Sequence, residues 1–94
     1  MRLRWTPLAA GQLKSAYEYV ARDSPSAAGE TIERILSAVE VLDRHAHIGR
    51  KGRVPRTREL VVTGTPFLVA YRVKADQIEI LAVLHGARRW PERS

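Results

Sequence analysis

The chain has 94 residues, 45% of them hydrophobic, and this length suits a single domain over residues 1–94 with a modest core. It contains no cysteine, which excludes disulfides and cysteine-based zinc sites. It has neither an apolar run of membrane-spanning length nor the apolar core of a signal peptide, so a cytoplasmic protein without a membrane partner is expected. The formal charge is +6, and residues 48–94 hold ten basic and four acidic side chains, which indicates a polyanion or an acidic protein as partner.

The chain is expected to open with a short edge strand followed by a helix. Leu3 and Trp5 alternate with arginines, as in a strand. Thr6 then has the form of a helix N-cap, with Pro7 at the first helical position, and the helix should run to about Arg22. Its buried stripe is predicted at Ala10, Leu13, Tyr17 and Val20. We therefore expect both aromatic residues, the tryptophan and the tyrosine, to be structural.

A second helix is predicted after the same signal, with Ser24 as cap and Pro25 as first residue. Its buried stripe is expected at Ala28, Ile32, Ile35, Leu36, Val39 and Leu42. The connection is so short that the two helices must form an antiparallel hairpin. His45 and His47 close this helix and lie two residues apart, so they point in different directions and no metal pair is expected.

A cationic loop follows at residues 49–58, with five basic residues and two glycines. This composition predicts a flexible segment that leads into the next strand. We expect it to bind the target, or another polyanion, through basic side chains. These residues are Arg50, Lys51, Arg53 and Arg56.

Three apolar runs separated by turn residues predict three antiparallel strands. They are expected at Arg58–Thr63, Phe67–Lys74 and Ile78–His85. With the N-terminal strand they make a twisted, mainly antiparallel, four-stranded sheet. The fold class is therefore α+β, with the helix hairpin on one face of the sheet.

The second face of this sheet is also apolar, and the hairpin can cover only one face. Simple alternation along the strands places Leu68, Ala70, Leu81 and Val83 on the second face. This face needs the segment after His85, a partner, or both to cover it. We predict that it is a partner-binding surface.

Several residues can handle phosphate or protons. His85, Arg58, Arg72 and Arg88 form one candidate group for phosphate binding and proton transfer. Arg89 and Trp90 can contact phosphates and stack on bases, although Trp90 is expected more simply as a lid on the core. Glu59 is better explained as an ion-paired strand carboxylate than as a catalytic acid or base.

Several short motifs follow one another along the chain: Trp5-Thr6, Ser24-Pro25, Gly49-Arg50, Thr57-Arg58-Glu59-Leu60, the run from Phe67 to Val73, and Leu84-His85-Gly86-Ala87-Arg88. In the order and spacing of these motifs, nearly the whole chain resembles the RelE/ParE superfamily of bacterial toxins from type II toxin-antitoxin modules. The resemblance implies a cognate antitoxin, encoded beside this gene, that forms a hetero-oligomer with the chain. We expect the antitoxin to cover the partner-binding surface.

Two activities occur in that superfamily. RelE-like members cleave mRNA in the ribosomal A site, whereas ParE-like members poison DNA gyrase and have no known hydrolytic site. The RelE-like pattern has an arginine early in the middle strand, where this chain has Phe67 and Leu68. We therefore favour a gyrase poison, with a ribonuclease that uses the four-residue candidate group as the alternative, and expect no cofactor or metal. A plain nucleic-acid-binding module would explain the charge but would leave the doubly apolar sheet without a use.

Overall fold

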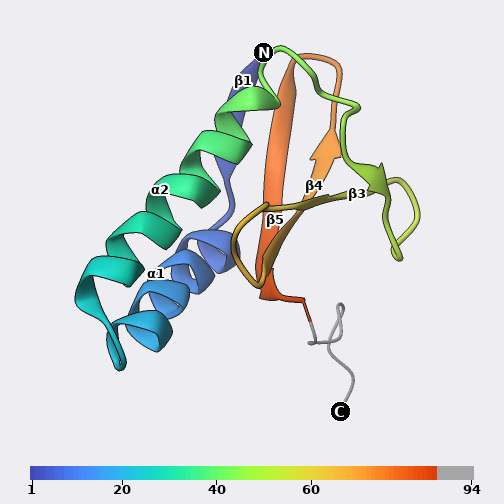
Figure 1. The fold of residues 1–94 in the computed structure, drawn as a ribbon. Helices are drawn as coiled ribbons and strands as arrows, with labels where there is room; N and C mark the ends of the chain where they lie inside the picture. The colour runs from blue at the N-terminus through green and yellow to red at the C-terminus, as the bar shows by residue number, and fades with distance from the viewer. Residues whose placement is uncertain (87–94) are drawn as a thin grey trace.

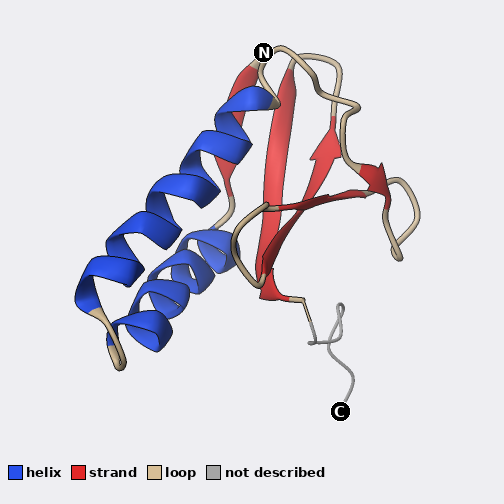
Figure 2. Ribbon diagram, viewed as in Figure 1, coloured by secondary structure: helices blue, strands red, loops and turns tan. Residues whose placement is uncertain are grey.

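The computed structural model describes residues 1–86 and shows two helices packed on one face of a five-stranded sheet (Figures 1 and 2). The elements are β1 (Arg2–Trp5), α1 (Pro7–Ala21), α2 (Pro25–Val41), β2 (Arg50–Lys51), β3 (Arg58–Val61), β4 (Phe67–Val73) and β5 (Gln77–His85). The strand order is β1-β5-β4-β3-β2, and only β1 and β5 run parallel. The predicted α+β class and helix hairpin are confirmed.

The sheet has five strands rather than four because part of the cationic loop joins it. Arg50 and Lys51 pair with Glu59 and Arg58 as the short strand β2. The N-terminal strand joins at the opposite edge, where it pairs with the first half of β5. Within residues 1–86, neither helix is long and apolar enough to cross a membrane.

Both helices begin at the predicted cap residues. The hydroxyl of Thr6 accepts a hydrogen bond from the Ala9 N–H, and that of Ser24 accepts one from the Ala27 N–H, each at 3.2 Å. A proline follows each cap, where the missing N–H costs no helical hydrogen bond. The two cap-and-proline pairs therefore set where the hairpin starts and where it reverses.

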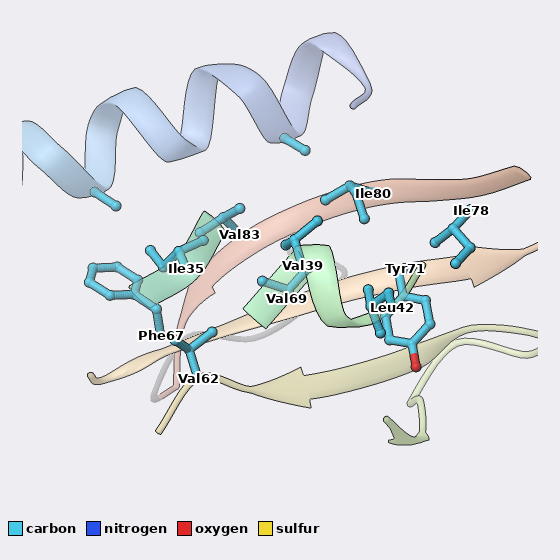
Figure 3. Packing of buried hydrophobic residues seen from close by; sticks show 12 residues of the cluster. Ile35, Val39, Leu42, Val62, Phe67, Val69, Tyr71, Ile78, Ile80 and Val83 are labelled. Atoms are coloured by element: carbon cyan, nitrogen blue, oxygen red, sulfur yellow. The ribbon is translucent and has the colours of Figure 1, made fainter. Parts of the chain in front are cut away.

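The main core lies between the helices and the sheet, and Figure 3 shows Ile35 and Val39 of α2 directed toward side chains of the strands. Its buried members are Ala9, Ala16, Ile35, Val39, Leu42, Val62, Phe67, Val69, Tyr71, Ile78, Ile80 and Val83. Leu13 and Val20 pack against this core, as predicted. The predicted burial of Ala10, Tyr17 and Leu36 is wrong, since Ala10 is exposed and the other two are 42% and 39% exposed.

The error at Tyr17 has a geometric cause. Its neighbour Ala16 makes the buried contact, and successive residues of a helix are rotated by about 100° from each other. A tyrosine beside a buried alanine must therefore point largely outward. Small side chains at Ala9 and Ala16 let α1 approach β5 closely.

The alternation of β5 is broken by a β-bulge. Ala82 pairs with Ala70 and Ile80 pairs with Tyr71, so Leu81 between them has no partner on β4. One extra residue on a strand reverses the faces of every side chain beyond it. Residues after Leu81 therefore lie on the opposite face from the one that a regular strand would give them.

Because of the bulge, the second face of the sheet carries partly different residues from those predicted. Val83 packs with the helices rather than on the second face, so that assignment is wrong. The second face carries a separate buried cluster of Leu68, Ala70, Ala82 and Leu84. Leu68 is 4% exposed and Ala70 is fully buried, so neither offers the open surface that we predicted for a partner.

Candidate functional site

The cationic loop is attached to the sheet at Tyr71, whose side chain is buried in the main core. Its hydroxyl donates a hydrogen bond to the Ala46 carbonyl and accepts one from the Gly49 N–H, both at 2.8 Å. Burial raises the pKa of this hydroxyl above its usual value, against smaller opposing effects of the Gly49 hydrogen bond and Arg58. An added Cβ at Gly49 would lie 2.6 Å from the hydroxyl oxygen, so only glycine allows this approach.

Glu59 organises the rest of the loop. The residue is 2% exposed, and its carboxylate accepts hydrogen bonds from Arg50 Nη2 at 3.3 Å and from the Arg53 backbone N–H at 3.1 Å. Arg53 Nε adds an ion pair at 3.3 Å. The interpretation of Glu59 as an ion-paired carboxylate is confirmed.

The tip of the loop is closed by hydrogen bonds of its own. The Gly52 N–H donates to the Thr57 carbonyl at 2.8 Å, and the Thr57 hydroxyl donates to the Val54 carbonyl at 2.7 Å. Arg56 has a left-handed backbone with φ of 62°, which is uncommon outside glycine. The predicted flexible segment is therefore a hydrogen-bonded hairpin.

The hairpin brings the predicted polyanion-binding residues of the loop together. Arg50, Lys51, Arg53 and Arg56 are all exposed. We call these four residues the basic hairpin. Because Glu59 contacts both Arg50 and Arg53, the guanidinium groups of these two residues are held beside each other at the edge of the sheet.

The candidate ribonuclease residues are not gathered in one place. Arg58 lies opposite Tyr71 on the helix side of the sheet, and its Nη1 donates to the carbonyls of Gly49 at 2.8 Å and His47 at 3.2 Å. It therefore supports the chain where α2 leads into β2. Arg72 is the next residue of β4 after Tyr71, so it lies on the opposite face.

His85 lies at the far end of the helix side. Its ring meets those of Tyr19 and Phe67 edge to face, with centroid distances of 6.1 and 5.7 Å. His85 pairs with Phe67, whereas Arg58 pairs with Tyr71. Phe67 and Tyr71 are four residues apart on β4, so the two pairs are separated by roughly 13 Å along the strand, at about 3.3 Å per residue. The structure thus separates His85 from Arg58 along the strand, and from Arg72 by the sheet itself.

The remaining predicted residues, Arg88, Arg89 and Trp90, lie outside the described residues. Within residues 1–86, no group of histidine and acidic side chains is placed to hold a metal ion.

Two surface cavities were not predicted from the sequence. One, of about 570 Å³, lies between α1 and the end of β5 and is lined by Gln12, Tyr19, Arg22 and His85, among others. The other, of about 430 Å³, lies between α2 and β3. Both combine residues that are far apart in the sequence, and no local pattern marks such a combination.

The comparisons with known proteins all find toxins or toxin-antitoxin systems. A family model described as the ParE toxin of the type II toxin-antitoxin system parDE matches residues 3–90. "Putative toxin Y4kP" of Sinorhizobium fredii is 40% identical over 91 residues, which cover 97% of this chain and 94% of that protein. "Toxin RelE3" of Caulobacter vibrioides is 32% identical over 85 residues, 88% of this chain and 91% of that protein.

A solved structure gives the same result for the fold. A chain of the chromosomal ParDE toxin-antitoxin system from P. aeruginosa superposes with a TM-score of 0.81 at 33% sequence identity. The match covers 90% of this chain and 95% of that one.

Proposed function

The chain belongs to the ParE toxin family of type II toxin-antitoxin systems, and on this basis we propose that it stops growth by poisoning DNA gyrase until a cognate antitoxin neutralises it. Gyrase is the target that the ParE-like branch of the superfamily implies. Gyrase works in the bacterial cytoplasm, so the toxin acts there.

The main support is the placement of the two candidate proton carriers. RNA cleavage through the 2'-hydroxyl requires a base, an acid and stabilisation of the charged phosphate at one point. Glu59 pairs with Ala70 and therefore faces the second side of the sheet, whereas His85 packs between rings on the helix side. Glu59 is also engaged by two arginines. This arrangement suits a toxin that acts by binding.

The basic hairpin supplies a surface for such binding. Its exposed cations lie on a short strand and loop, where Glu59 contacts Arg50 and Arg53, and they fit phosphates or an acidic protein surface. Together with Arg89 and Trp90, beyond the described residues, these are the side chains that we assign to contact with the target.

The alternative function is a RelE-like, ribosome-dependent mRNA interferase. The similarity to the protein named Toxin RelE3 favours it. It would require Arg58, Arg72, His85 and Arg88 to act on one phosphate.

Two parallel assays separate these functions. The purified chain is added to gyrase with supercoiled plasmid, and to programmed ribosomes with mRNA. We expect trapped double-strand breaks in the first assay and intact mRNA in the second. Codon-phased mRNA cuts that disappear in His85→Gln, with no effect on gyrase, would replace our proposal with the alternative.

A further inference from the structure

The cavity of about 570 Å³ beside α1 lies where β5 continues past the end of β1. β1 pairs with β5 only as far as Ile80, and α1 packs against the strand beyond that point. There the Gln12 Oε1 atom accepts a hydrogen bond from the Val83 N–H at 2.8 Å. Because the N–H must meet the amide oxygen, the NH2 group of Gln12 is left as a hydrogen-bond donor at the cavity.

Polar side chains line this cavity along one side of α1. Gln12, Ser15, Tyr19 and Arg22 follow one another at spacings of three or four residues, so they project from the same side of the helix. Together they supply an amide, two hydroxyl groups and a guanidinium group. Several hydrogen-bond donors and one cation therefore converge on the cavity from a single helix.

The charge at the cavity favours an anionic ligand. Arg22 is exposed, and within residues 1–86 it takes part in no ion pair. Glu18 and Asp23 lie next to cavity residues in the sequence, but no acidic side chain is among the described residues that line the cavity. A guanidinium group that is not ion-paired suits a phosphate, to which it can donate two parallel hydrogen bonds.

Three aromatic rings meet at the same cavity. The ring of His85 contacts those of Tyr19 and Phe67 edge to face. Phe67 is buried, whereas Tyr19 is 56% exposed, so part of the Tyr19 ring remains open to a ligand. Exposed aromatic rings are platforms on which nucleobases stack. Arg22 follows Tyr19 by three residues, so this platform and the cation lie side by side.

We propose that this cavity binds a nucleotide. The base stacks on the ring of Tyr19, and the phosphate receives hydrogen bonds from Arg22. The amide of Gln12 and the hydroxyl of Ser15 donate to the sugar or the base. A volume of about 570 Å³ is ordinary for a small-molecule site. The inference goes beyond the proposed function and does not depend on it, because the cavity shares no residue with the basic hairpin.

Isothermal titration calorimetry of the purified full chain tests the site with four probes. They are deoxyadenosine 5'-monophosphate, deoxyadenosine, inorganic phosphate and single-stranded hexadeoxyadenylate. We expect the monophosphate or the hexamer to bind with a Kd below about 1 mM, and at least about tenfold more tightly than deoxyadenosine or phosphate. The proposal fails if neither binds more tightly than inorganic phosphate.

The same titrations distinguish two sources of the nucleotide. Binding of the monophosphate would identify a free nucleotide as a sufficient ligand. Tight binding of the hexamer alone would identify a nucleotide within a single strand. Both results support the proposal, because the base and the phosphate are recognised in the same way.

Matched variants test whether the ligand lies in the cavity. Tyr19→Ala and Arg22→Ala, both at exposed positions, should each weaken binding by about tenfold. Tyr17→Ala and Lys14→Ala remove a tyrosine and a cation from parts of α1 that do not line the cavity, and each should change the Kd by less than about twofold. Thermal melts report whether each variant keeps the fold, and Tyr19→Leu replaces Tyr19→Ala if the latter unfolds.

Two results with the variants would overturn the proposal. Unchanged binding in both Tyr19→Ala and Arg22→Ala would place the ligand elsewhere. Binding that is lost in Lys51→Ala/Arg56→Ala but kept in Arg22→Ala would place the phosphate on the basic hairpin. Neither result bears on the toxin proposal, which is tested separately by plasmid cleavage with gyrase.

Discussion

At the scale of single residues, the basic hairpin depends on two buried polar side chains, Glu59 and Tyr71. The glutamate contacts two arginines, and the tyrosine joins the connection between α2 and β2 to the sheet. Neither role is visible in the sequence as a pattern, because each depends on partners from other segments. The four cations can be identified as a group from the sequence because they lie within one loop, and their role in binding stays a prediction.

Glu59→Gln should lower stability by about 1–3 kcal/mol, because a neutral amide attracts the two arginines less and one buried contact is lost. The arginine side chains are 59% and 42% exposed, so solvent screening keeps the effect at this modest level. Denaturant unfolding measures this change in the free energy of unfolding. Glu40→Gln, on the exposed side of α2, is the control and should stay within about 0.5 kcal/mol. Equal stability of the two variants would show that Glu59 does not support the hairpin.

Tyr71→Phe should cost about 1–3 kcal/mol, because it leaves the Gly49 N–H and the Ala46 carbonyl without their partner. It should also change the pH dependence of unfolding. The pKa of Tyr71 is raised in the folded state, so its stabilising effect is fully present below the unfolded value of about 10 and is lost as the pH rises through the folded value.

Urea unfolding across this alkaline range measures the effect. The unaltered chain should lose stability more steeply with rising pH than Tyr71→Phe. Tyr19→Phe, at an exposed tyrosine, should keep the behaviour of the unaltered chain. Identical pH profiles for the unaltered chain and Tyr71→Phe would contradict the burial of this hydroxyl.

At the scale of elements, local sequence signals predicted where the helices start and which strands pair, while tertiary contacts decided which face of each element is buried. Thr6 and Ser24 marked both helix starts because capping is a local interaction. Alternation failed in β5 because the bulge at Leu81 inserts one residue, and no glycine or proline marks it there. Periodicity failed at Tyr17 because neighbouring small residues make the closer contact.

Truncation of two aromatic residues tests this account of the elements. Trp5 is partly buried against the main core, so Trp5→Ala should cost about 2–4 kcal/mol. Tyr17→Ala should cost less than about 1 kcal/mol, since that side chain is 42% exposed. Thermal melts show which variant loses more stability. A larger loss of stability for Tyr17→Ala than for Trp5→Ala would show that α1 is rotated from its place in the structure.

At the scale of the whole molecule, the sheet separates groups that lie close in sequence. Arg58 and Glu59 are adjacent residues, yet Arg58 supports the connection between α2 and β2 from the helix side, and Glu59 contacts the basic hairpin from the second face. The candidate ribonuclease group looked plausible as a list of residue types, but strand register divides its described members between two faces and two ends. Register is a property of the folded sheet and cannot be read from residue types alone.

We propose that this toxin acts by binding through its basic hairpin and not by proton transfer at His85. The direct measurement is the toxin concentration that gives half-maximal gyrase-mediated plasmid cleavage, for the unaltered chain, Lys51→Ala/Arg56→Ala and His85→Gln. We predict that the double variant, which removes two exposed cations and keeps the Glu59 contacts, needs about tenfold more toxin, while His85→Gln stays within about threefold. A normal double variant beside an inactive but folded His85→Gln would contradict the claim.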